Sequence, residues 1–142
     1  MQPKSVGEVK LRSANPLDQP LIDPRYLSHA DDIKVFHKAL EIIRKLSQTV
    51  AFAPLNGGEL APGPGDPDGF IRSQSSTLWH PAGTCRMGQD AHAVVDARLR
   101  VRGVAGLRVA DASVMPTVTS GNTVAACFMI GERAAEMLLA DA

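Results

Sequence analysis

The chain has 142 residues, of which 44% are hydrophobic and 21% charged, so it can form one soluble domain with a hydrophobic core. Fifteen basic and 15 acidic residues give a formal net charge of zero, which provides no electrostatic reason to expect nucleic acid or an anionic membrane as a partner. Two cysteines, Cys85 and Cys127, are too few for a disulfide framework and favour a reduced, cytoplasmic protein.

No apolar core of a signal peptide is visible after Met1. The longest apolar run, residues 124–130, is far shorter than the roughly 20 residues that a membrane-spanning helix needs. A membrane span is therefore not expected.

A strand is predicted over residues 6–12, where Val9 and Leu11 alternate with charged residues. A strand with one polar face indicates an antiparallel sheet. The turn signals Asn15-Pro16 and Asp23-Pro24 follow it.

Residues 28–46 carry the clearest helix pattern of the chain. Ser28 is the predicted N-cap, with Asp31 at the third position after it. The apolar residues recur at helical spacing: Ile33, Phe36, Ala39, Leu40, Ile43 and Leu46. An amphipathic helix whose polar face is solvated is therefore expected.

Residues 53–69 contain four prolines and five glycines, so no regular element is expected there. A loop of this length is often a lid or a partner contact, and a disordered surface loop is an equally good reading.

The last third is predicted to contain strands over residues 95–101 and 107–110 and a helix over residues 121–139. The first turns of that helix are apolar on every side, which is typical of a helix that is buried all round. The rest of the chain offers little to cover it, so part of its packing surface is expected on other sequence.

The densest cluster of reactive side chains is Leu78-Trp79-His80-Pro81-Ala82-Gly83-Thr84-Cys85-Arg86-Met87-Gly88. Pro81 restricts the backbone of the residue before it, and an imidazole titrates near pH 6.5, so His80 is a candidate positioned base. A metal site formed with Cys85 is a weaker alternative, because further ligands at suitable spacing are missing.

Two further motifs follow, at residues 109–116 and 120–123. Asp111 ends a predicted strand, which is where open α/β sheets bind ligands. Asn122 opens the last helix, where free amides favour negative charge, and it could also cap that helix.

Taken together, the motifs His80 to Gly88, Val109 to Pro116 and Gly121-Asn122-Thr123 resemble the C-terminal region of the glucose–methanol–choline (GMC) oxidoreductases, most closely the choline dehydrogenase-like members. Segments 3–9 and 20–27 are similar to the same family, so the resemblance covers nearly the whole chain.

The resemblance implies a role for each matched residue. His80 falls on the catalytic histidine that accepts the hydroxyl proton of an alcohol, and Asn122 on the position that hydrogen-bonds the substrate oxygen. Asp111, Ala112, Asn122 and Thr123 fall on segments that contact FAD, and hydride passes from the carbinol carbon to the flavin.

The resemblance also implies an α+β fold, in which residues 1–142 form the C-terminal domain of such an oxidoreductase. Residues of about 6–72 belong to the substrate-side sheet and helix, and residues of about 73–142 supply the catalytic motif and the closing strand and buried helix of the FAD domain. The implied partners are a small alcohol and a flavin-binding segment.

Two departures qualify this picture. Val6 stands where the family commonly has arginine, and the N-terminal βαβ unit with its Gly-x-Gly-x-x-Gly turn is absent, so the FAD site is incomplete. The alternative is a truncated, non-catalytic remnant, or a module that only packs against another polypeptide.

Overall fold

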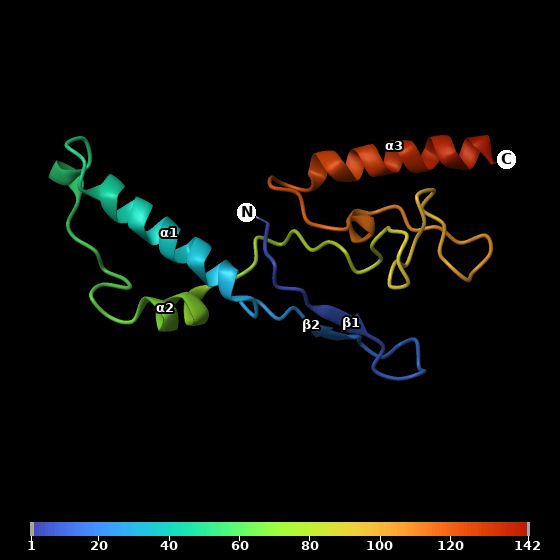
Figure 1. Cartoon of the computed structure of the whole chain (residues 1–142), viewed down its shortest axis with the longest axis horizontal. Coiled ribbons are helices and arrows are strands. Elements are labelled where there is room, and N and C mark those ends of the chain that lie inside the picture. The colour runs from blue at the N-terminus through green and yellow to red at the C-terminus, as the bar shows by residue number, and fades with distance from the viewer. Residues whose placement is uncertain (1, 142) are drawn as a thin grey trace. The chain divides into compact units, whose positions relative to one another are not determined.

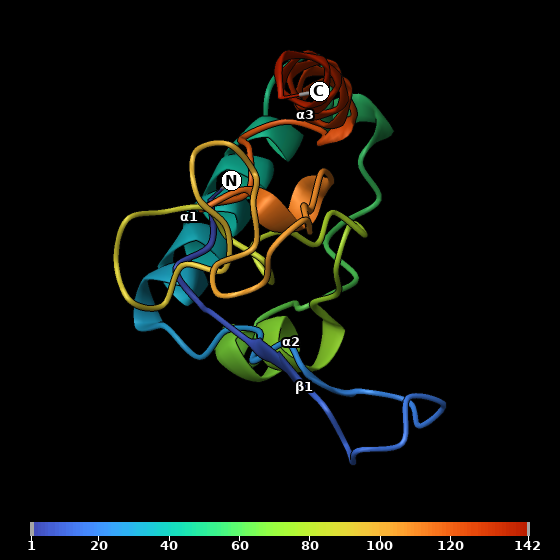
Figure 2. The ribbon, with the colours of Figure 1, turned by 90° about the vertical axis from the view of Figure 1, so that its right-hand side faces the viewer.

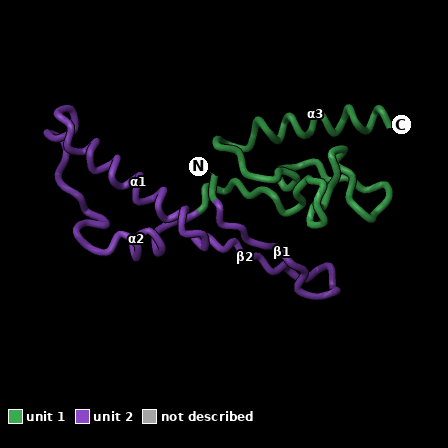
Figure 3. Tube along the Cα trace, viewed as in Figure 1, with its two compact units in different colours: residues 1–3, 77–142 green, residues 4–76 purple. Residues whose placement is uncertain are grey.

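The computed structural model describes residues 2–141, which divide into two compact units. Figure 3 shows unit 1, which contains the described residues 2–3 and 77–141, and unit 2, made of Lys4–Ser76. Each unit is described by itself.

The predicted α+β class is confirmed (Figure 1). Unit 2 contains a two-stranded sheet and two helices, and unit 1 contains one long helix over irregular segments. In chain order the elements are β1 (Glu8–Lys10), β2 (Leu21–Asp23), α1 (Ala30–Ser47), the 3₁₀ turn η1 (Ala53–Leu55), α2 (Pro67–Gln74), the 3₁₀ turn η2 (Ala112–Val114) and α3 (Val124–Ala140).

Strands β1 and β2 pair in the expected antiparallel direction, with Val9 opposite Ile22. The strand predicted over residues 6–12 is only three residues long. Its start is fixed by Gly7, where a Cβ atom would lie 2.2 Å from the carbonyl oxygen of Asp23. Glycine therefore lets the two backbones approach closely at this point.

Helix α1 begins two residues later than predicted, and Ser28 is not its cap. His29 is the N-cap, and its Nδ1 accepts a hydrogen bond from the Asp31 amide at 3.2 Å. Asp32 is buried and accepts from the amides of Lys4 at 2.8 Å and Ser5 at 2.9 Å, and from the Ser5 hydroxyl. Burial opposes ionisation of Asp32, yet these donors keep its pKa below the usual value.

The apolar stripe of α1 divides between two environments. Ile33 is buried and Phe36 and Leu40 are half-buried, and α1 packs against α2 within unit 2. Ile43 and Leu46, which the pattern placed on the same stripe, are exposed.

The prediction of no regular element over residues 53–69 is wrong at both ends of that range, since η1 begins it and α2 starts within it. Asp66 caps α2 by accepting from the amides of Asp68 and Gly69, and Pro67 occupies the first helical position, where its missing N–H costs nothing. In the loop between η1 and α2, Glu59 accepts two hydrogen bonds from the guanidinium of Arg44 in α1, at 2.9 and 2.7 Å.

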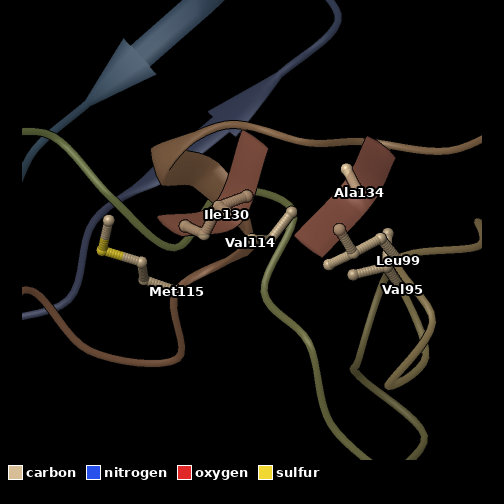
Figure 4. Close-up of a cluster of buried hydrophobic side chains, with 6 residues drawn as sticks. All are labelled: Val95, Leu99, Val114, Met115, Ile130 and Ala134. Carbon is tan, nitrogen blue, oxygen red and sulfur yellow. The ribbon is translucent and has the colours of Figure 1, made fainter. Parts of the chain in front are cut away.

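The core of unit 1 forms where α3 lies on the irregular segments that precede it. Figure 4 shows Ile130 and Ala134 of α3 beside Val114, Val95 and Leu99. Val95 and Val114 are fully buried, so this cluster fixes both η2 and the turn near residue 99 beneath the helix.

The prediction of strands over residues 95–101 and 107–110 is wrong. Val95 pairs with Met87 and Val101, and Arg100 with Arg108, only as isolated bridges. Leu99 has a φ of 62°, in the left-handed region that interrupts an extended strand. The alternation of apolar residues here comes from a chain that turns back on itself.

Helix α3 matches the predicted helix within a few residues. Irregular segments of unit 1 lie along one side of it (Figures 1 and 2), and its exposed apolar side chains include Phe128 at 74% and Leu139 at 81% exposure. The expected uncovered surface is therefore present among the described residues. No described helix is both long and apolar enough to cross a bilayer.

Candidate functional site

The His80 motif is held by backbone hydrogen bonds on two sides. On one side, the amides of Cys85 and Met87 donate to the carbonyl oxygens of Ser113 at 2.9 Å and Val114 at 2.8 Å. On the other, Gly88 donates to the carbonyl of Val95 at 3.2 Å. The first and second predicted motifs therefore lie side by side.

His80 and Asn122 meet although 42 positions separate them in the chain. The Nε2 atom of His80 lies 3.2 Å from Oδ1 of Asn122. Because an amide oxygen only accepts, this arrangement corresponds to an imidazole that donates from Nε2. The structure thus brings together the two residues predicted to share a substrate oxygen.

The side chain of Asn122 does not cap α3. Thr123 is the N-cap residue and makes no side-chain capping hydrogen bond. The first-turn amides of α3 therefore lack a side-chain acceptor from the cap, and the positive end of the helix dipole lies next to Asn122.

Trp79 has a φ of 60°, which is uncommon for a large side chain. Its amide donates to the Thr77 hydroxyl at 2.9 Å, which stabilises the turn just before His80. The indole is 81% exposed, so among the described residues it does not shield the imidazole from water.

Asp111 and Ala112, predicted to contact FAD, lie at the start of η2. Oδ1 of Asp111 accepts from the amide of Ser113 at 2.8 Å, and its carbonyl accepts from Val114 at 3.2 Å. Sequence reasoning did not assign this capping role, although an aspartate two residues before a serine is a typical side-chain turn signal.

Arg86 is engaged within its own turn. Its guanidinium contacts both carboxyl oxygens of Asp90, at 2.9 and 2.6 Å, and this pairing holds the pKa of Asp90 well below the usual range. The cysteines of the same region are free: Cys85 is half-buried, and Cys127 packs against the core of unit 1.

The three arginines of the predicted strand 95–101 and its continuation each bind a protein acceptor. Arg98 contacts Asp141 at 2.5 Å, Arg100 contacts Asp96 at 2.8 Å, and Arg102 donates to the carbonyl of Gly88 at 2.6 Å. These contacts give each of the three arginines a structural role.

A shallow hollow of about 810 Å³ lies between the turn at residues 100–108 and the end of α3. Its lining includes neither His80 nor Asn122. His80 is half-buried and Asn122 exposed, so these two side chains form one wall of a site and not an enclosed pocket.

Comparison with known proteins identifies relatives over the whole chain. A family model for GMC oxidoreductases matches residues 3–131. Alcohol dehydrogenase [acceptor] of Pseudomonas putida is 46% identical over 96% of this chain, and mitochondrial choline dehydrogenase of Homo sapiens is 46% identical over 97% of it. The chain spans about a quarter of their length, 26% and 24% respectively.

Solved structures show the same fold. Pyridoxine 4-oxidase from Mesorbium loti matches with a TM-score of 0.87 and 40% identity, over 95% of this chain and 27% of its own. An FAD-dependent oxidoreductase from Chaetomium thermophilum matches with a TM-score of 0.84 and 31% identity, over 95% of this chain and 24% of its own.

Proposed function

Since the chain belongs to the GMC oxidoreductase family, as its motifs predicted, we propose that it is the C-terminal part of an FAD-dependent enzyme that oxidises alcohols. The observation that carries the proposal is the 3.2 Å contact between His80 Nε2 and Asn122 Oδ1. It places a proton acceptor and an amide where both can reach one hydroxyl oxygen.

His80 acts as the general base in this proposal. The alcohol hydroxyl replaces Asn122 as the partner of Nε2, and the neutral imidazole, in the tautomer that carries its proton on Nδ1, accepts the hydroxyl proton at Nε2 as the C–H bond breaks and the C=O bond forms. Bound FAD supplies the two-electron acceptor for the hydride that leaves the carbinol carbon.

Asn122 holds the substrate oxygen. Its amide carries an oxygen that accepts and an NH2 group that donates, so the NH2 group can donate to the alcohol oxygen when the hydroxyl lies between Asn122 and His80. The donor would stabilise the negative charge that develops on the oxygen as the proton leaves.

The residues at the start of α3 fit a flavin. The first-turn amides beside Asn122 and Thr123 have no side-chain acceptor from the cap, and reduced flavin carries negative charge on its pyrimidine edge. Asp111 and Ala112 would lie on the cofactor side of η2.

The partner that we propose for this chain is a flavin-binding part. Two observations support it: the chain spans 24–26% of its longer relatives, and the outer face of α3 exposes large apolar side chains. A face of this kind is typical of a surface that another segment covers.

The test replaces His80 with alanine in the complete flavoprotein and uses choline, pyridoxine and n-butanol as probe alcohols. Loss of a general base should slow alcohol-dependent flavin reduction by about 10²–10⁴-fold with any alcohol that the native protein oxidises. Stopped-flow absorbance of the flavin measures this rate.

His92 provides the matched control, because it is exposed in a turn of the same unit. His92→Ala should reduce flavin at the native rate. An equally fast reaction in His80→Ala would contradict the proposal, and a protein that binds no flavin and oxidises none of the probes would favour the non-catalytic remnant.

A further inference from the structure

We propose that Asp111 is a positioning residue for His80, and that it acts through a side-chain hydrogen bond and not through its charge. The inference rests on the proposed function, because it concerns the placement of the base in that reaction. It assigns to Asp111 a task within the protein itself, in addition to any contact with a cofactor.

Asp111 closes the 3₁₀ turn η2. Its Oδ1 accepts from the Ser113 amide at 2.8 Å, while its carbonyl accepts from Val114 at 3.2 Å, and the two bonds define the 3₁₀ turn η2. Among the described residues Asp111 forms no ion pair with a basic side chain. The visible role of its carboxylate is therefore that of an acceptor.

The turn η2 directs two of its carbonyl groups toward the His80 motif. In η2 the carbonyls of Ser113 and Val114 point at the His80 motif, where they accept from the amides of Cys85 and Met87 at 2.9 and 2.8 Å. Val114 is fully buried, so this pairing lies in the interior. A turn that opens would leave buried backbone groups unpaired or would move the segment of the His80 motif that pairs with it.

A second contact joins the end of this turn to the backbone near His80, at Gly83. Gly83 has a φ of 89°, and a Cβ atom on it would lie 3.3 Å from the carbonyl oxygen of Met115. The backbone three residues after His80 thus lies against Met115, the residue that directly follows η2. A displacement of η2 is transmitted to the imidazole over this short path.

The experiment compares Asp111→Ala, Asp111→Asn and Asp111→Ser in the complete flavoprotein. Asparagine and serine provide a side-chain oxygen without charge and cap turns about as well as aspartate, whereas alanine does not. We expect Asp111→Ala to lower kcat by about 10–100-fold with little change in KM, because a displacement of about 1 Å can cost that much.

Asp111→Asn and Asp111→Ser should recover most of the kcat that Asp111→Ala loses, by about tenfold or more. Each kcat is expressed per bound flavin, which visible absorbance measures, so that a loss of cofactor is separated from a loss of positioning. If Asp111→Asn is as slow as Asp111→Ala, the charge is what matters and the proposal is overturned. A native kcat in Asp111→Ala, or loss of flavin in Asp111→Asn, overturns it as well.

Two further arms keep the outcome interpretable. If Asp111→Ala does not accumulate as folded protein, Asp111→Gly replaces it, since glycine is well tolerated at a cap but has no side-chain acceptor. His80→Ala is measured in parallel: full activity there refutes the proposed function, whereas an inactive His80→Ala beside a fully active Asp111→Ala refutes only the positioning role.

Discussion

Gly7 shows how one missing side chain determines the start of the sheet. A Cβ atom at this position would lie 2.2 Å from the Asp23 carbonyl oxygen and 2.6 Å from Cα of Pro24. Both are backbone atoms, so no side-chain rotation could relieve the contact. The pairing of β1 and β2 therefore requires glycine here for close approach.

Gly7→Ala is accordingly expected to lower the free energy of unfolding by about 1–3 kcal/mol, the usual cost of forcing extra volume into a packed place. Urea unfolding followed by circular dichroism measures the change. Gly57→Ala is the matched control, because nothing lies within 4 Å of a Cβ atom there and unit 2 also contains it. Equal stability of the two variants would show that the strands move apart at little cost.

The site illustrates what sequence can predict at the scale of single residues. Pattern alone singled out His80 as a candidate base, and only the resemblance to a family paired it with Asn122, because a separation of 42 positions carries no signal of their spatial contact. The capping role of Asp111 could have been found from its spacing to Ser113. It was missed because the strand expected before it suggested a ligand position instead.

At the scale of elements, long periodic segments were predictable and short ones were not. The helices at Ala30–Ser47 and Val124–Ala140 follow from apolar spacing that persists over several turns. The strands expected over 95–101 and 107–110 failed, since local alternation does not reveal that Leu99 adopts a left-handed conformation. Helix α2 was not predicted because the prolines and glycines of its region favour a loop, although Asp66-Pro67 is a good helix start.

The turn that replaces the predicted strand depends on Asp96. This carboxylate accepts hydrogen bonds from the amide and the side chain of Arg100 and from the amide of Arg98. These donors lower the pKa of Asp96 to about 2. A carboxylate whose pKa is lower in the folded state stabilises the fold above its unfolded pKa. That contribution should be lost as the pH falls from about 4, the ordinary aspartate value, through about 2.

Carbon-13 NMR of the side-chain carboxyl groups can follow Asp96 directly, and we expect its titration midpoint near 2. Asp96→Asn should weaken the acid-dependent loss of structure in that range. A midpoint for Asp96 at the ordinary aspartate value would show that these donors do not hold the carboxylate in solution.

For the whole molecule, the question is what covers α3. One face of this helix is buried against unit 1 through Ile130 and Ala134. A second stripe at helical spacing is exposed throughout and contains Val124, Phe128, Gly131, Ala135, Leu138 and Leu139. In the proposed enzyme, the flavin-binding part covers this second face, with the small residues in its middle allowing close approach.

Phe128→Glu tests that arrangement, because a charge buried without a partner is strongly destabilising. In the complete flavoprotein we expect this variant to lose most of its bound FAD and soluble yield, whereas Arg133→Glu, on the polar side of the same helix, should retain both. Flavin absorbance per purified protein measures the difference. If Phe128→Glu binds FAD as well as Arg133→Glu does, the outer face of α3 remains exposed in the enzyme, and another surface must join this chain to its flavin-binding part.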